Sequence, residues 1–280
     1  MKNMGRMMAI ACAIVLTLAM FSGCGANTGV EDGVLTVAME CAYAPYNWSQ
    51  PTDENGAVPI KGSNLYANGY DVMTAKKICE ANGWKLEVVQ SDWDSLIPAV
   101  QAGTVDAVIA GQSMTSDRME AVDFAGPYLY ATIVCLTKKG SAYENAKGIN
   151  DLAGGSCTSQ SGTIWYDSLL PQIKDADIKT PAADPASMLM ALETGAVDFI
   201  CTDMPTAQAA LLVYPDFVLL DFANSGNDFT VSEEEINIGI SVRKGNKTLL
   251  DKINAYFNGK TAADFNALME QAIKIQPIEE

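Results

Sequence analysis

The pattern of hydrophobic and polar positions along the chain repeats once. Residues 94–111 and residues 186–203, which lie 92 positions further on, each place an apolar helical stretch before a glycine, Gly103 or Gly195. A Val-Asp pair then starts a short apolar run in both copies, and five of the eighteen aligned positions are identical. We interpret the copies as equivalent helix–strand units of two similar α/β lobes. A chance match is the alternative, because helix–glycine–strand units are common in α/β proteins.

The ends of the two repeats indicate where a ligand would bind. In open α/β sheets, ligands bind beyond the carboxyl ends of the strands. The apolar runs of the repeats stop at Gly111 and Asp203. Two lobes that face one another would bring these positions to a common cleft, so a two-lobed binding protein is our leading interpretation.

The same pattern predicts the elements around the first repeat. Strands are expected at 34–39, 84–89 and 105–110, and a helix is expected over 71–82, ending at Gly83.

A polar segment separates the first strand from this helix. Residues 47–69 are rich in Asn, Gly, Pro and Ser, so they are predicted to form an unusually long loop. Loops of this length are often functional. After the third strand, Thr115 is predicted to cap a short helix that carries Arg118.

Two extended apolar segments, 128–136 and 236–243, are predicted to cross between the lobes and to form a hinge. The predicted division is lobe I at 34–135 plus 236–280, and lobe II at 136–235.

Further elements are assigned to each lobe. The second lobe is expected to hold a strand at 156–159, a helix that opens at Thr163 and a helix that starts at Asp184-Pro185. Helices at 247–258 and 262–274 are expected to pack back on the first lobe.

The first 23 residues have the pattern of a secretion signal. Lys2 and Arg6 precede an apolar stretch at 7–21, which is shorter than the roughly 20 residues that a spanning helix needs. The following Ser22-Gly23-Cys24 resembles a bacterial lipobox, although Phe21 stands where leucine is usual.

We therefore expect residues 1–23 to be a lipoprotein signal peptide, Cys24 to carry lipid and residues 24–33 to form a tether. A secreted form without lipid is the alternative. No second apolar segment reaches membrane length, which argues against a sensor kinase or a chemoreceptor. The expected location is extracytoplasmic, with a lipid anchor in the bacterial cell membrane.

Composition narrows the possible partners. Lys and Arg total 18 against 34 Asp and Glu, and the formal net charge of −16 argues against nucleic acid or an anionic membrane surface as a partner. A cationic or zwitterionic small ligand is compatible with this charge. The chain has no histidine, which removes Ser-His and Cys-His nucleophilic pairs and imidazole metal sites. We expect neither a metal nor a cofactor.

The spacing of the cysteines does not indicate a set of disulfide bonds or a metal site. An odd number of them follows the signal at irregular spacing, so a disulfide framework and a zinc site are both unfavoured, and buried free thiols are expected. Cys157 and Cys201 fall on two predicted strands of the second lobe and are candidates to be neighbours. The cysteines after the signal are Cys41, Cys79, Cys135, Cys157 and Cys201.

Arg118 is the first candidate binding residue. It lies at the start of the short helix after the strand that ends near Gly111, and a guanidinium there can hold a carboxylate through two parallel hydrogen bonds. Ser113 and neighbouring backbone N–H groups could add donors. The alternative is a surface arginine that pairs with Asp117 or Glu120.

Asp203 lies at the equivalent strand end of the second lobe. Its carboxylate could accept a ligand ammonium, or it could cap the helix that Pro205 begins. The segment Gln160-Ser-Gly162-Thr163 ends a strand and starts a helix, so its amides could hold a carboxylate. An ordinary turn explains it about as well.

Aromatic residues follow several predicted strands and could clamp an aliphatic, cationic or aromatic ligand side chain. Core filling is the alternative for each, and it is our interpretation of Trp84, which lies within a strand. Tyr43 and Trp93 are the better candidates. The aromatic residues at loop positions are Tyr43, Tyr46, Trp48, Trp93 and Trp165.

With these residues identified, the chain resembles the family 3 solute-binding proteins of bacterial ABC importers for polar amino acids. The resemblance runs from about residue 34 to 275. It is carried by Tyr43-Ala-Pro-Tyr46, Gly69-Tyr-Asp71, Trp93-Asp-Ser-Leu-Ile-Pro-Ala-Val-Gln-Ala-Gly103, Gly111-Gln-Ser-Met-Thr-Ser-Asp-Arg118, Val122-Asp-Phe-Ala-Gly-Pro-Tyr128, Val197-Asp-Phe-Ile-Cys-Thr-Asp203 and Ile238-Gly-Ile-Ser-Val-Arg-Lys-Gly-Asn246.

The resemblance implies an α/β, two-lobed periplasmic-binding-protein-like fold of type II with two hinge crossovers. It implies an extracytoplasmic lipoprotein that captures a free amino acid by hinge closure and presents it to an ABC permease and ATPase complex. A monomer is expected.

Carried over residue by residue, the resemblance implies that Arg118 binds the α-carboxylate of the amino acid. Ser113 and the amides near Gly162 and Thr163 would assist. Asp203 would take the α-ammonium.

The resemblance also implies how the remaining residues act. The carbonyl of Gly111 would assist at the ammonium, and Tyr43 and Trp93 would sandwich the ligand side chain. Glu40 matches a position that is acidic in relatives that bind lysine, arginine or ornithine. A basic amino acid is therefore favoured, with neutral polar or aromatic amino acids as alternatives.

The chain departs from the family pattern at several positions. Met73 replaces a common acidic residue, and Ile164 and Trp165 stand where a threonine and a polar residue are common. The 47–69 segment is also unusually long. We expect Trp165 to close the pocket around a flat or cationic group.

Two other classes of function are alternatives. Some relatives with this fold resemble enzymes such as cyclohexadienyl dehydratases, which need a general acid in the cleft, and Glu40 is the candidate for that role. A signalling or adhesion lipoprotein without a transport role is the other alternative.

Overall fold

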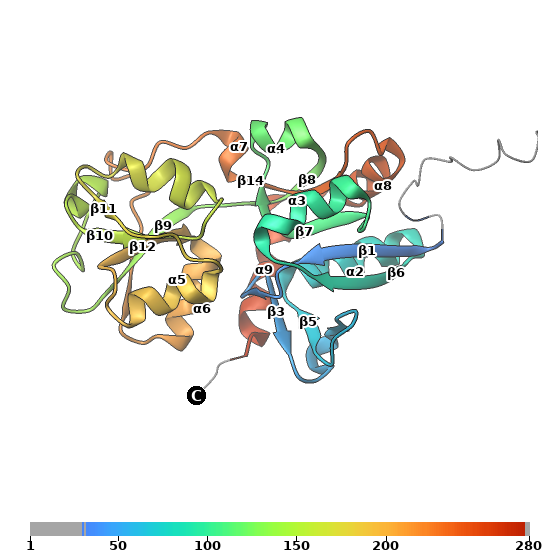
Figure 1. Ribbon diagram of the computed structural model, residues 1–280, viewed down its shortest axis with the longest axis horizontal. Coiled ribbons are helices and arrows are strands. Elements are labelled where there is room, and N and C mark those ends of the chain that lie inside the picture. The colour runs from blue at the N-terminus through green and yellow to red at the C-terminus, as the bar shows by residue number, and fades with distance from the viewer. Residues whose placement is uncertain (1–29, 31, 278–280) are drawn as a thin grey trace, which may run out of the picture.

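Two five-stranded sheets organise the computed structural model, which describes residue 30 and residues 32–277 (Figure 1). The predicted signal peptide, the lipidation site Cys24 and the first part of the predicted tether lie outside the described residues. In the described part of the chain, no helix is long and apolar enough to cross a membrane.

The first sheet has the strand order β6-β1-β7-β14-β8. β1 pairs in parallel with β6 and β7, whereas β14 pairs antiparallel with β7 and β8. The central strand β7 begins with a continuous buried apolar run, as expected for a strand that is covered on both faces. The strands are β1 (Val34–Met39), β6 (Lys85–Gln90), β7 (Ala107–Ser113), β8 (Val122–Tyr130) and β14 (Asn237–Arg243).

Helices cover this first sheet, and the two C-terminal helices return to it as predicted. The predicted ends of two helices are confirmed, because Gly83 and Gly103 adopt the left-handed conformation that favours glycine after a helix. The covering helices are α2 (Tyr70–Asn82), α3 (Trp93–Ala102), α8 (Lys247–Phe257) and α9 (Ala262–Ile275).

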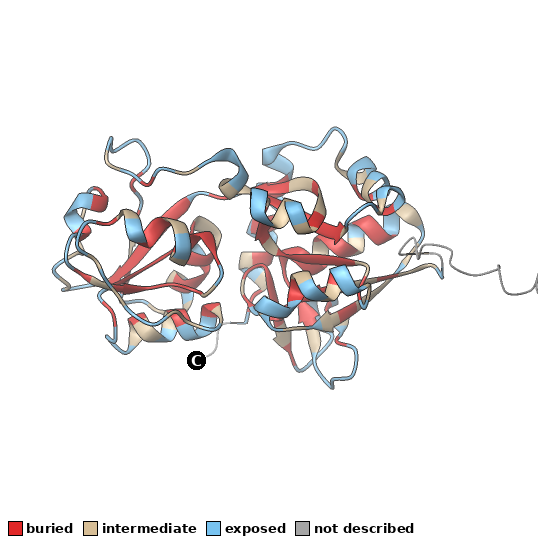
Figure 2. Cartoon of the chain, turned by 45° about the horizontal axis from the view of Figure 1, so that its top comes forward, coloured by how far each residue is buried: buried red, intermediate tan, exposed pale blue. Residues whose placement is uncertain are grey.

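The second sheet has the strand order β11-β10-β12-β9-β13. β7 and β12, the strands of the sequence repeat, each occupy the middle of their sheet, which agrees with two similar α/β lobes. Figure 2 shows that buried residues concentrate in the strands of both lobes. The strands are β9 (Ile133–Lys138), β10 (Ser156–Thr158), β11 (Asp177–Ile178), β12 (Phe199–Asp203) and β13 (Phe217–Leu220).

The helical segments around the second sheet are mostly short. They are η2 (Ile149–Leu152), η3 (Trp165–Leu169), η4 (Leu170–Gln172), α5 (Pro185–Glu193), α6 (Met204–Val213) and α7 (Glu233–Ile236).

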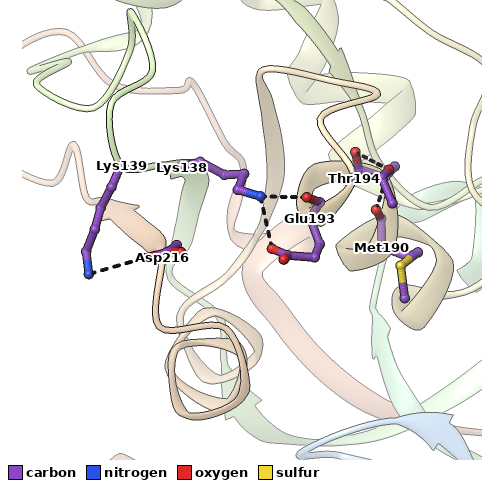
Figure 3. A network of polar contacts seen from close by, with 7 residues as sticks. Lys138, Lys139, Met190, Glu193, Thr194 and Asp216 are labelled. Atoms are coloured by element: carbon purple, nitrogen blue, oxygen red, sulfur yellow. Dashed lines mark hydrogen bonds and ion pairs between the residues drawn. The ribbon is translucent and has the colours of Figure 1, made fainter.

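A polar network fastens α5 to the second sheet (Figure 3). The ammonium of Lys138, at the end of β9, donates to the carbonyl of Glu193 and lies 3.2 Å from its carboxylate. A cation at this place satisfies a free carbonyl of the last helical turn and opposes the negative end of the helix dipole. The helix that precedes β12 is thus held at both ends, because Asp184 caps its start.

The predicted crossover at 128–136 is not one extended segment. β8 of the first sheet ends at Tyr130 and β9 of the second sheet begins at Ile133, so the chain changes lobe between two strands. The returning segment is extended as predicted, with α7 immediately before β14 (Figure 1).

The prediction of a long loop at 47–69 is wrong. This segment supplies three strands of a four-stranded antiparallel sheet, in the order β2-β3-β5-β4. Its strands are only two to four residues long, so they carry too few alternating positions to be distinguished from a loop. The elements are β2 (Ala42–Tyr43), β3 (Asn47–Gln50), η1 (Glu54–Gly56), β4 (Val58–Pro59) and β5 (Tyr66–Asn68).

Two predicted helix starts have different outcomes. Thr115 caps α4 (Ser116–Ala121), and its side chain accepts a hydrogen bond from the backbone N–H of Arg118. By contrast, no regular α-helix opens at Thr163. The helical turns begin one residue later and wind as a π-helix, η3, that includes Trp165.

The five cysteines in the described part of the chain are free and buried, as predicted. Cys157 and Cys201 lie on the adjacent strands β10 and β12, but they are not opposite one another. The strand register places Phe199 opposite Cys157, and Cys135 of β9 opposite Cys201.

Candidate ligand-binding site

A small cavity lies between the two lobes, beside the carboxyl ends of β7 and β12. The volume that the centre of a water-sized sphere can occupy in this cavity is about 20 Å³. The cavity therefore has room for about one water molecule. Admission of a larger ligand therefore requires the lobes or the lining side chains to move. The lining residues are Tyr43, Trp93, Gly111, Ser113, Arg118, Ala131, Gln160, Thr163, Ile164, Trp165, Asp203 and Ile238.

Most of the predicted site residues line this cavity. Glu40 and Gly162 are the exceptions, and each contacts a lining residue from behind. Gly111 and Ser113 lie within β7 itself and not beyond its end.

Arg118 reaches from lobe I to lobe II. Its Nη1 donates to the carbonyl of Ser113 and its Nη2 donates to the carbonyl of Gly162, both at 3.0 Å. The guanidinium carbon lies 5.2 Å from the centre of the Trp93 ring. None of the ion pairs between described residues involves Arg118, so the alternative of a surface pair with Asp117 or Glu120 is not observed.

The cation of Arg118 persists at neutral pH. Burial lowers the pKa of Arg118 to about 10, and the nearby Asp167 carboxylate opposes that shift. A partly buried guanidinium whose hydrogen bonds go only to carbonyls still has N–H capacity for an anion.

Asp203 caps a helix, which is one of the two roles that the sequence suggested as alternatives. Its role as the acceptor of a ligand ammonium stays a prediction. One carboxylate oxygen, Oδ1, accepts from the N–H of Thr206 at 2.9 Å and caps α6. The other oxygen, Oδ2, faces lobe I and accepts from the hydroxyls of Tyr43 and Tyr46 at 3.0 and 2.8 Å. Burial raises the pKa of Asp203.

Tyr43, which lines the cavity, stacks on Tyr46. Their ring centres lie 4.4 Å apart, and the edge of Trp165 approaches Tyr43. Gly111 lies directly beneath, in the left-handed conformation, and a Cβ there would stand 2.8 Å from a ring carbon of Tyr43. Trp93 borders the opposite side and donates from Nε1 to the carbonyl of Gly162 at 3.3 Å.

Glu40 and Gln160 meet across the interface of the lobes. The amide nitrogen of Gln160 donates to Oε1 of Glu40 at 2.8 Å, while Oε2 of Glu40 is buried without a hydrogen-bond partner. Burial is the main cause that raises the pKa of Glu40 to about 8. The carboxylates of Asp184, Asp71 and Asp92 raise it further, and the hydrogen bond from Gln160 opposes the shift.

A buried network behind the cavity holds its parts in register. Asp71 accepts from the hydroxyl of Tyr128 at 2.6 Å and from the amide of Asn47 at 2.7 Å. That tyrosine hydroxyl accepts from the N–H of Gly111, and the Asn47 side chain accepts from the N–H of Cys41. Asp71 thereby links the backbone on either side of the cavity.

Sequence reasoning named Tyr46 and the segment 160–163 only as general candidates, and it did not select Asp71 as part of the site. Tyr46 and Gln160 carried a usable signal, because each follows a predicted strand next to a proposed binding residue. Asp71 is the first residue of a predicted helix, and no local signal distinguished it from a surface carboxylate.

Within the residues that the structure describes, no group of His, Cys, Asp and Glu side chains is placed to hold a metal ion. The site instead joins a cation and an anion from different lobes, with aromatic rings between them. These features define a two-lobed protein that encloses a small solute.

Comparison with known proteins identifies the family. Residues 35–271 match the bacterial extracellular solute-binding proteins, family 3. The chain belongs to this family, as the sequence resemblance predicted, and it is an extracytoplasmic solute-binding protein.

Individual relatives differ in the ligand they are named for. A probable histidine-binding protein of Neisseria gonorrhoeae is 28% identical over 266 residues, which cover 88% of this chain and 87% of the relative. An ancestral arginine-binding protein bound to arginine is 30% identical with a TM-score of 0.67, covering 85% of this chain and 97% of that one.

A third similar protein is an ancestral amino-acid-binding protein described as a precursor of cyclohexadienyl dehydratase. It is 28% identical with a TM-score of 0.70, and the match covers 87% of this chain and 97% of that one. Binding proteins therefore dominate this comparison, and the fold also lies on a route to an enzyme.

Proposed function

We propose that the protein captures a free amino acid, preferably one with a cationic side chain, and presents it to an ABC importer. The observation that carries this proposal is that Arg118 of lobe I and Asp203 of lobe II both line one cavity. An amino acid is a zwitterion, so a fixed cation and a fixed anion from different lobes complement it. The family membership supports the same function.

Each end of the ligand has proposed partners. Arg118 would bind the α-carboxylate, assisted by Ser113 and by the amides of Gly162 and Thr163. Asp203 would bind the α-ammonium.

The remaining groups would surround the ligand. The carbonyl of Gly111 would also accept from the ammonium, and Tyr43, Trp93 and Trp165 would pack on the side chain. The closeness of the Arg118 guanidinium to Trp93 supports a site that tolerates cation–aromatic contacts.

Glu40 would recognise the cationic end of the side chain. Its Oε2 is buried and has no hydrogen-bond donor among the described residues, and a guanidinium or ammonium would supply both the donor and the opposite charge. The relatives named for histidine and arginine support this preference. Neutral polar or aromatic amino acids are the alternative ligands.

Binding would be coupled to closure of the lobes. Lobe I would comprise 34–135 and 236–280, and lobe II 136–235, with β9 starting slightly before that boundary at Ile133. Because the two charges of the ligand are held by different lobes, the closed state binds more tightly and its population rises.

The rest of the chain fits this role. We propose a lipid on Cys24 that anchors a monomer outside the cytoplasm, next to its permease and ATPase complex. A Cys24→Ser variant is then expected in the soluble fraction. Recovery of that variant with the membranes, in the same amount as the unaltered chain, would contradict the anchor.

An enzymatic function is the second candidate, because Glu40 would keep its proton at neutral pH and could act as a general acid. The similarity to a precursor of cyclohexadienyl dehydratase favours this option. Formation of product from prephenate or arogenate would establish it. We place it second because the relatives compared above are named as binding proteins.

A thermal-shift screen tests the proposed function. The protein is stripped of ligand by unfolding and refolding, then screened against the twenty amino acids, ornithine, citrulline and cystine. A ligand at about 100 times its dissociation constant adds about 2.7 kcal/mol to the free energy of unfolding. Stabilisation by arginine, lysine or ornithine is expected. Stabilisation by neutral amino acids alone would remove the role of Glu40, and no response would contradict the function.

A further inference from the structure

The pair formed by Glu40 and Gln160 has an incomplete set of hydrogen bonds. Glu40 follows β1 in lobe I, and Gln160 follows β10 in lobe II. The Gln160 amide is 1% exposed and donates to Oε1 of Glu40 at 2.8 Å and to the carbonyl of Ala183 at 3.5 Å. Oε2 of Glu40 has no partner, although the residue is only 5% exposed.

An ionised carboxylate in this place is unfavourable. Burying a charge without a counter-ion or a full set of donors costs several kcal/mol, so a neutral acid is the cheaper form. Three nearby carboxylates act on Glu40: Asp184 at the start of α5, Asp71 on α2 and Asp92 at the start of α3. Together with burial they raise the pKa of Glu40 to about 8.

We propose that capture of an amino acid with a cationic side chain displaces the proton of Glu40, so that binding releases a proton and tightens as the pH rises. This inference rests on the proposed function and adds a proton linkage to it. The proton passes from Oε2 to the solvent, and the ligand cation takes its place as the partner of that oxygen. No covalent bond to the ligand forms or breaks.

Gln160 acts as a positioning residue in this exchange. Its amide holds Oε1, which leaves Oε2 as the free oxygen of the carboxyl group. Because the amide comes from the opposite lobe, this orientation depends on closure. Gln160 thereby links the protonation of Glu40 to the closed state.

Calorimetric titration of the purified protein with L-arginine and L-citrulline tests the linkage. Citrulline has nearly the same shape but a neutral side chain, and it shares the α-carboxylate and α-ammonium. Any proton released at Asp203 by the ammonium is therefore common to both ligands. Titrations in phosphate and in Tris at pH 7 separate the heat of binding from the heat of buffer protonation.

The expected difference between the ligands is large. With a pKa of about 8, Glu40 is about nine-tenths protonated at pH 7, so arginine should release about 0.9 proton more than citrulline. The ratio of the citrulline to the arginine dissociation constant should rise about tenfold between pH 6 and pH 7.

Two variants complete the test. Glu40→Gln should bind citrulline and should abolish the extra proton released by arginine, whereas Asp117→Asn, which removes a carboxylate at the outer mouth of the cleft, should leave it unchanged. Gln160→Ala should reduce the preference for arginine over citrulline at fixed pH.

The outcomes separate this inference from the proposed function. Equal proton release by arginine and citrulline, with both bound, would overturn the linkage and leave the amino-acid-binding function in place. Binding of neither ligand would overturn the preference for arginine-like ligands and the linkage with it. If Glu40→Gln still released the extra proton on binding arginine, that proton would come from another group and the proposal would be refuted.

Discussion

The hydroxyl of Tyr46 in lobe I lies 2.8 Å from Oδ2 of Asp203 in lobe II. The hydroxyl of Tyr43 reaches the same oxygen at 3.0 Å. The carboxylate that we propose as the receptor for the ligand ammonium is thus occupied by two phenols when the lobes meet. An incoming ammonium must compete with these internal hydrogen bonds, so they lower the affinity while they hold the lobes together.

Replacement of Tyr46 by phenylalanine is expected to strengthen ligand binding. The variant keeps the ring that stacks on Tyr43 and removes one donor to Asp203. A hydrogen bond of this kind contributes about 0.5–1.5 kcal/mol, so the dissociation constant for arginine should fall about 2- to 10-fold, measured by calorimetry. Tyr166→Phe is a matched control, because that hydroxyl bonds the Lys179 carbonyl. An unchanged or weaker affinity of Tyr46→Phe would contradict the competition.

Arg118→Ala is expected to weaken amino-acid binding by about 100-fold or more. A charged hydrogen bond contributes about 1.5–3 kcal/mol, and a guanidinium can make two with one carboxylate. The unfolding temperature should change little, because the guanidinium bonds only two carbonyls and forms no ion pair between described residues. Equilibrium dialysis with radiolabelled arginine measures the effect. Lys247→Ala, which removes an exposed cation, serves as the control and should bind normally.

Gly111→Ala separates crowding from backbone strain. Gly111 has a φ of +64°, and its added Cβ would meet Tyr43 at 2.8 Å. Strain alone should cost about 1 kcal/mol of folding free energy, and the clash should displace the Tyr43 ring and weaken binding further. Gly140→Ala is the control, since Gly140 has a φ of +77° with no atom within 4 Å of the added carbon. Denaturation should show a loss of stability in both variants. Calorimetry should show a binding defect only in Gly111→Ala.

The ligand-free protein is expected to lose stability as the pH rises from 5 to 8. Burial raises the pKa of Glu40 from 4.5 to about 8 and that of Asp71 from 3.8 to about 7. At a pH between the unfolded-state pKa and the folded-state pKa of either group, the folded protein holds a proton that the unfolded chain has lost. Stability is therefore greatest below the unfolded pKa and falls through the folded pKa, by at most about 1.4 kcal/mol per pH unit and group.

Urea denaturation at a series of pH values measures this slope. In Glu40→Gln the decline between pH 7 and pH 8 should become much shallower, because the pKa of Asp71 is about 7 and this group completes its titration over the same range. A stability that is constant or that increases over this range in the unaltered protein would show that the buried carboxyls are already ionised in the folded state.

The local sequence was sufficient to predict those helices and strands whose caps and apolar patterns lie within a few residues of one another. β1 has the predicted bounds, and α2 and α3 end at Gly83 and Gly103, where only glycine adopts the left-handed conformation at low cost. Thr115 caps α4 because its hydroxyl needs only the N–H three residues later. The repeated helix–strand pattern indicated two similar sheets, since apolar periodicity reports which strands are buried.

Tertiary structure decided what local patterns do not encode. The composition of the 47–69 segment is typical of a loop. It nevertheless forms strands, because β3 and β4 both pair with β5. Tyr46 and Asp203 are 157 positions apart, and Glu40 and Gln160 are 120 apart, so closure of the lobes selects these partners. The sequence by itself determined the residue types and the two lobes. Burial between those lobes determined which carboxylates are satisfied and which keep a proton, because desolvation depends on the assembled surroundings.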